Sequence, residues 1–86
     1  MNSLPLRRLS DLRIGEASTI KEVMLPEEDR RRMNVLGFAV GNEVFASRTV
    51  PGGDPTVYEI DGNSVALRRE AAMHVIVSAA RTGALE

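Results

Sequence analysis

Residues 52–70, GGDPTVYEIDGNSVALRRE, predict a tight turn, a strand, a reversal, a second strand and then a charged helical turn. The two leading glycines permit positive φ angles, and Pro55 disfavours helix at the residue before it. Apolar and polar residues alternate from Thr56 to Asp61, and Asp61-Gly62 is a strong signal for a two-residue hairpin reversal. We therefore expect a β-hairpin here, with Tyr58 and Ile60 on its inner face.

The rest of the chain extends this hairpin into a mainly β fold. Strands are expected over residues 16–25, 42–51 and 74–78, in addition to the two strands of the hairpin. A leucine-rich turn of helix is expected before Gly15, and a helical turn over residues 68–73 should precede the last strand. Five short strands with closely spaced turns predict a small antiparallel barrel, SH3-like or OB-like, with one short helix inserted after the first strand.

Residues 26–37, PEEDRRRMNVLG, carry the clearest helix signal. Pro26 suits the first turn, the acidic residues that follow it lie at the positive end of the helix dipole, and Gly37 suits a left-handed C-terminal cap. Met33 and Leu36 are three residues apart and are expected to face the core. Arg30 and Arg31 should then point outward.

Length and composition limit the function classes. An 86-residue chain with 43% hydrophobic and 27% charged residues is enough for one globular domain, which we place over residues 1–86 with a core at about 9–77. Eleven Lys plus Arg against twelve Asp plus Glu give a net charge of −1, and three aromatic rings offer little for base stacking, so no nucleic-acid partner is expected. The chain has no Cys, which fits a cytoplasmic protein, and no apolar run approaches the roughly 20 residues that insert into a bilayer.

The residues that could carry chemistry are too few to predict an enzyme. His74 is the only imidazole, so neither a catalytic triad nor a multi-histidine metal site can be assembled, and an ordinary strand residue is the preferred interpretation. The glycines at 37 and 41 lack the Lys-Ser/Thr of a phosphate loop. We expect no catalytic residue, no cofactor and no metal ligand.

Two basic clusters are candidates for binding a partner. The run Arg30–Arg32 could be a solvated helix face, a protein-docking surface or the source of an arginine that acts on a partner's nucleotide. Arg68 and Arg69 could pair with nearby acids such as Asp54 or Glu59, or could belong to a contact surface. The residues alone indicate a small β-barrel interaction module.

The order of these elements resembles the FeoA family, the ferrous iron transport protein A and its relatives. The likeness covers roughly residues 9–77 and rests on the segments LSDLRIGE, RRMNVLGFAVGNEV and VPGGDPTVYEIDGNSVALRREAAMHVIV. Its Arg-Leu-x-x-Leu-Gly-x-x-x-Gly and Gly-Asp-Pro to Leu-Arg-Arg motifs match these residues: Arg32, Met33, Leu36, Gly37, Gly41, Gly53, Asp54, Pro55, Gly62, Leu67, Arg68 and Arg69. The sequence departs from the family pattern at Met33, where Leu is usual, and at Asn63, where an aromatic residue is common.

The resemblance implies an SH3-like barrel and an accessory role beside FeoB, the membrane iron transporter with a cytosolic GTP-binding domain. The expected partner contacts are Arg30 and Arg31 on the helix, followed by Asp54, Pro55 and Arg69 near the hairpin. The alternative implied by the same barrel is a regulatory domain related to the C-terminal domain of iron-dependent repressors. The same domain is compatible with a homo-oligomer.

Overall fold

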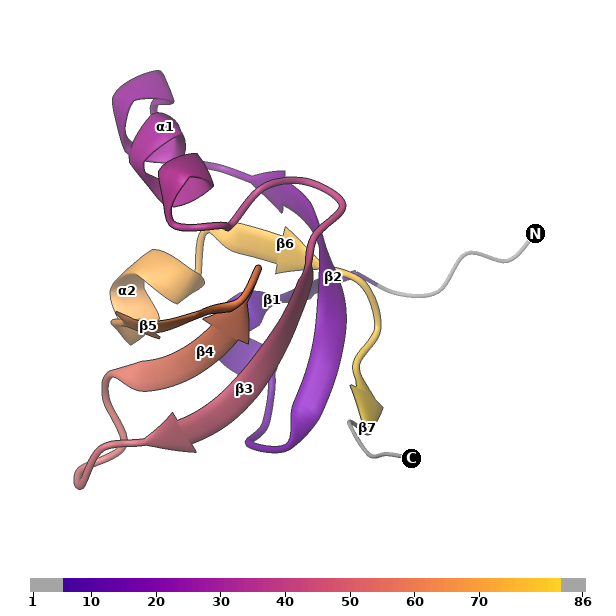
Figure 1. Ribbon diagram of the computed structural model, residues 1–86, viewed down its shortest axis with the longest axis vertical. Coiled ribbons are helices and arrows are strands. Elements are labelled where there is room, and N and C mark those ends of the chain that lie inside the picture. The colour runs from indigo at the N-terminus through magenta and orange to yellow at the C-terminus, as the bar shows by residue number, and fades with distance from the viewer. Residues whose placement is uncertain (1–5, 83–86) are drawn as a thin grey trace.

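The computed structural model describes residues 6–82 and shows a strongly curved antiparallel sheet with two small helices (Figure 1). The strands are β1 (Arg7–Arg8), β2 (Glu16–Val23), β3 (Glu43–Thr49), β4 (Thr56–Ile60), β5 (Asn63–Leu67), β6 (Val75–Val77) and β7 (Arg81–Thr82). The helical elements are the 3₁₀ turn η1 (Leu9–Asp11), α1 (Glu27–Val35) and α2 (Arg69–Ala72). The structure confirms the mainly β class, the helix inserted between β2 and β3, and the helical turn before β6. The two-residue strands β1 and β7 add to the five that the sequence predicts.

The strand order is β1-β6-β2-β3-β4-β5, with β7 also paired to β2. β2 makes the curvature, because its first half pairs with β3 and its second half with β6, and the register shifts between Ile20 and Glu22. Among residues 6–82, β1 and β5 are the two end strands of the sheet. They are not paired with each other, so the sheet does not close. The helical pieces α2 and η1 lie beside each other, and they contribute the buried side chains of Ala72 and Leu9 to the core.

The hairpin formed by β4 and β5 follows the expected local rules. Asp61 (φ 50°) and Gly62 (φ 78°) form the reversal, and Ile60 pairs with Asn63 directly across it. Positive φ at both central residues is the geometry whose twist matches the flanking strands. Tyr58 and Ile60 are buried, as the alternation predicts.

The core is aliphatic around one aromatic pair. Phe38, from the loop after α1, meets Tyr58 of β4 edge to face, with ring centroids 6.3 Å apart and an interplanar angle of 85°. The other buried members come from nearly every element: Leu9, Leu12, Ile20, Val23, Met33, Val44, Ala46, Ile60, Leu67, Ala72, Val75 and Val77. The chain has three Phe and Tyr residues in total, and two of them lie in the core. Burial there removes the large apolar area of each aromatic side chain from water.

A buried serine, Ser18, is hydrogen-bonded to the half-buried Ser78. The Ser18 hydroxyl is fully buried and donates to the Ser78 carbonyl oxygen at 2.6 Å. The Ser78 hydroxyl oxygen lies 3.0 Å from that of Ser18 and accepts from the Thr19 amide at 3.1 Å. These bonds satisfy the buried hydroxyl and fasten the segment after β6 to β2.

We predict that the phenol of Tyr58 loses its proton at a higher pH than an ordinary tyrosine does. Burial raises its pKa above the ordinary value of 10.0, and Asp54 adds to the rise, while a hydrogen bond to Thr56 and the charge of Arg69 oppose it. The folded state therefore favours the neutral phenol over the phenolate. The free energy of unfolding includes this preference in full below pH 10, the ordinary pKa, and loses it as the pH rises through the folded pKa. Tyr58 is the single tyrosine and the chain has no Trp, so phenolate absorbance reports it alone. Titration at the same pH in native buffer and in urea would contradict the prediction.

Candidate protein-docking site

Helix α1 stands apart from the sheet at one end of the molecule (Figure 1). Its sequence explains its limits: Pro26 precedes the first turn, three acidic residues follow, and Gly37 (φ 108°) ends it. The Phe38 amide donates to the Met33 carbonyl at 2.9 Å, and the Gly37 amide to the Asn34 carbonyl at 3.0 Å. This is a Schellman cap, which turns the chain sharply and directs Phe38 into the core.

Met33 is the only residue of α1 that is buried. The expectation that Leu36 also faces the core is wrong, because its side chain is 41% exposed, and Val35 beside it is 84% exposed. Within α1, only Met33 is buried against the rest of the molecule, and Leu36, three residues later, lies at the edge of this contact. Almost the whole helix surface is therefore available to another molecule.

Arg30 and Arg31 both lie on this exposed surface, as predicted. Arg31 donates to Glu27 at 3.1 Å and Arg32 to Asp29 at 3.1 Å, both within the helix and both well exposed. Exposed pairs of this spacing contribute only about 0.3–0.5 kcal/mol each. Within residues 6–82, Glu28 and Arg30 take part in no ion pair. The helix thus carries charges that the fold itself does not use.

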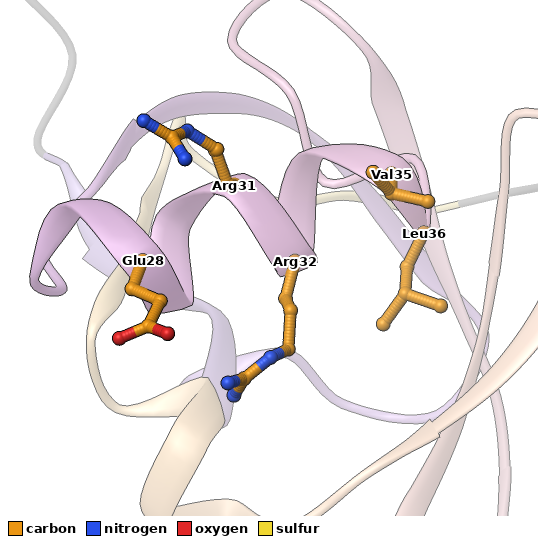
Figure 2. A pocket seen from close by; sticks show the side chains of 5 residues that line it. All are labelled: Glu28, Arg31, Arg32, Val35 and Leu36. Atoms are coloured by element: carbon orange, nitrogen blue, oxygen red, sulfur yellow. The ribbon is translucent and has the colours of Figure 1, made fainter.

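Surface hollows gather around α1. One is bordered by Glu28, Arg31, Arg32, Val35 and Leu36, where the aliphatic side chains lie just beyond the charged ones (Figure 2). Another, of about 300 Å³, lies between α1 and α2. Its border combines apolar side chains with one ion pair, namely Leu25, Met33, Leu36, Ala71, Asp29 and Arg32. A charged rim around exposed aliphatic groups is the composition of a protein-binding surface.

The other expected contacts form a separate group. The Asp54 carboxylate accepts a 2.9 Å hydrogen bond from the backbone amide of Arg69. Arg69 is the first residue of α2, so Asp54 satisfies a free amide at that helix end from a distant turn. Pro55 is half-buried beside it, and its carbonyl accepts from the Val50 amide at 3.3 Å. The structure brings Asp54, Pro55 and Arg69 together, away from α1.

The contact between Asp54 and Arg69 differs in kind from the side-chain pairing considered from the sequence. It uses the backbone amide of Arg69, and the guanidinium group belongs to an exposed residue. Glu59, the other acid considered, accepts instead from the Ser64 hydroxyl at 2.8 and 2.9 Å across the hairpin. Asp54 therefore has a structural task, while Arg69 keeps its charge at the surface.

His74 lies in the turn before β6, one residue earlier than the strand begins. Its carbonyl accepts from the Met24 amide at 2.7 Å, and its side chain is exposed. Among residues 6–82, no three His, Cys, Asp or Glu side chains converge where a metal ion could bind. None of the helices in this part of the chain is long and apolar enough to cross a membrane.

The fold defines the class as a small SH3-like β domain, with one helix largely exposed. The chain belongs to the FeoA family: the FeoA domain model matches residues 7–79. This is a family associated with ferrous iron transport, whose members are small accessory or regulatory domains. No curated protein matches the chain.

Solved structures agree with this assignment. The chain is similar to FeoA from Chlorobium tepidum, with 29% identity and a TM-score of 0.78 over 84% of this chain and 69% of that one. It is also similar to the zinc-complexed FeoA of Stenotrophomonas maltophilia, a prokaryotic SH3 domain protein, with 32% identity and a TM-score of 0.73 over 84% of this chain and 89% of that one. A manganese-dependent transcriptional repressor shares the fold at 19% identity and a TM-score of 0.76, over 91% of this chain and 44% of the repressor.

Proposed function

We propose that this protein is a cytoplasmic accessory factor of ferrous iron uptake that docks through α1 on the cytosolic GTP-binding domain of a FeoB-type transporter and modulates it. The observation that carries this is the exposure of Arg30 and Arg31 on a helix that contributes only Met33 to the core. Membership of a family associated with ferrous iron transport supports the choice of partner. Guanidinium groups suit either acidic side chains or nucleotide phosphates, because they bind oxygen pairs in a planar, bidentate geometry.

The proposed role is binding without catalysis. The described residues offer no nucleophile beside a base, and the one histidine is exposed in a turn. GTP hydrolysis by the purified protein alone, in proportion to its concentration, would contradict this. We likewise propose no direct binding to nucleic acid, given the net charge of −1.

The double substitution Arg30→Glu/Arg31→Glu is expected to weaken association with the isolated G domain by more than tenfold, or about 1.4 kcal/mol. It replaces two attractive charges by two repulsive ones and touches no core contact. Calorimetric titration at two salt concentrations measures the effect, and the parent affinity should fall as salt screens the contact. The matched control is Arg13→Glu/Arg48→Glu, which makes the same charge change at two exposed positions outside α1.

Two outcomes separate the alternatives. Undiminished binding by the α1 double variant would move the contact to Asp54, Pro55 and Arg69, and Arg69→Glu would then be the decisive variant. Absence of binding by the parent protein would favour a stand-alone regulatory domain, the second candidate. That candidate is supported by the fold shared with the manganese-dependent transcriptional repressor and with T. acidophilum IdeR, at TM-scores of 0.76 and 0.74.

A further inference from the structure

Residues 24–36, MLPEEDRRRMNVL, have an order of side chains that complements itself when reversed. Two apolar residues come first, acidic residues follow, basic residues come next, and two apolar residues end the segment. In an antiparallel pair of two copies, the acidic half of one segment would lie along the basic half of the other, and the apolar ends would lie near each other. An isologous two-fold interface requires this kind of self-complementary surface.

The structure leaves the members of this pattern open to solvent. Val35 is 84% exposed, Leu36 41% and Met24 56%, which puts three of the large exposed apolar side chains of the described residues in one short segment. Glu28 borders the same hollow as Arg32 and Val35 and has no ion pair among residues 6–82 (Figure 2). Hydrophobic groups and an unpaired carboxylate thus share one face.

We propose that this face, defined by Glu28, Arg31, Arg32, Val35 and Leu36, binds the same face of a second copy, with the two α1 helices antiparallel. The register that pairs acids with bases sets Glu28 opposite Arg32 of the second copy. It also brings Val35 and Leu36 beside the segment that precedes α1 in the second copy, where Met24 is 56% exposed. Arg30 lies nearest the two-fold axis but does not border the hollow at which the helices meet.

The antiparallel arrangement also pairs opposite ends of the two helix dipoles, which favours it over the parallel one. A nine-residue helix is about 13 Å long, so an interface confined to it is smaller than the roughly 1,200–2,000 Å² of stable complexes. The dimer is therefore weak and depends on concentration. The dimer covers Arg31, so it would compete with docking of a transporter on α1. The dimer proposal does not depend on the docking proposal.

Sedimentation equilibrium from about 10 µM to about 1 mM protein tests the pairing. We expect a reversible dimer, and we expect Val35→Asp to raise its dissociation constant at least tenfold. A parent protein that stays monomeric over the whole range overturns the proposal. A dimer that Val35→Asp leaves unchanged overturns it as well, because it would use another surface.

Charge reversal tests the register. Glu28→Arg alone and Arg32→Glu alone should each weaken self-association, since each places like charges opposite one another. An equimolar mixture of the two single variants should form a heterodimer at least tenfold tighter than either homodimer, because both cross-pairs are then opposite in charge. Arg48→Glu on β3 is the control for the charge change, and circular dichroism confirms that every variant is folded. Equal affinities in the mixture and in the separate variants would refute the register.

Discussion

Replacing Phe38 with alanine is expected to lower the free energy of unfolding by about 3–5 kcal/mol. The ring is fully buried and meets Tyr58 edge to face at 6.3 Å, so truncation removes both apolar burial and an aromatic contact. Tyr58 is the other ring of this core and is already packed there, so no spare aromatic side chain can fill the cavity. Stability of a domain this small is commonly about 5–10 kcal/mol, so the variant should be close to unfolding at 37 °C.

Urea denaturation followed by far-ultraviolet circular dichroism measures this loss. The control is Val40→Ala in the same loop, where the side chain is 68% exposed and the expected change is within about 0.5 kcal/mol. Phe38→Leu, which keeps most of the volume, should recover more than half of the stability. A loss below about 1 kcal/mol for Phe38→Ala would mean that the loop after α1 does not hold the core.

Gly37→Ala is expected to destabilise by about 2–4 kcal/mol for two reasons. The backbone at Gly37 has φ 108°, which L residues rarely adopt, and an added Cβ would lie 3.1 Å from the Cβ of Asp61 and 3.4 Å from the Ile60 carbonyl oxygen. The helix cap therefore sits directly against the β4–β5 reversal. Relieving the contact would require the cap or the reversal to move.

Gly62→Ala is the matched control, because Gly62 also has positive φ but an added Cβ there meets nothing within 4 Å. It should cost about 1 kcal/mol from backbone strain alone. The difference between the two variants, measured by thermal unfolding, isolates the contact between the cap and the hairpin. Equal losses at the two positions would show that this contact contributes nothing.

Local rules explain the parts of the fold that the sequence predicts well. The Asp61-Gly62 reversal, the Gly37 cap and the Gly52-Gly53 turn each depend on backbone angles that few residues tolerate, so their positions are marked by residue type. The alternation in β4 marks its buried face in the same way. None of these features needs knowledge of a distant partner.

Features set by distant neighbours are the ones that the sequence does not predict. β1 is two arginines, and only its pairing with Val77 and Ile76 makes it a strand. Ser18 looks like a solvent-facing strand residue until Ser78 is placed against it. The contact of Asp54 with the Arg69 amide likewise joins residues 15 positions apart.

The candidate site shows both cases. That Arg31 points outward follows from helical spacing, because it is two residues before the buried Met33. Arg30 is three residues before Met33, so its exposure in the structure does not follow from spacing alone. That Leu36 does not join Met33 in the core depends on how far α1 stands from the sheet, which spacing alone cannot give. The exposed Val35 carried a usable signal, since a residue two positions after a buried one lies on the opposite side of a helix.

The attachment of α1 through Met33 alone has a consequence for how such a domain can change. The barrel constrains Met33, the Gly37 cap and Phe38, and leaves the rest of the helix surface unconstrained by the core. Under the proposed docking through α1, binding preference can therefore be changed at the solvent-facing positions of α1 while the scaffold keeps its stability. A helix transplanted from a relative between Pro26 and Gly37, with Met33 retained, is then expected to carry its partner preference with it while the barrel still folds.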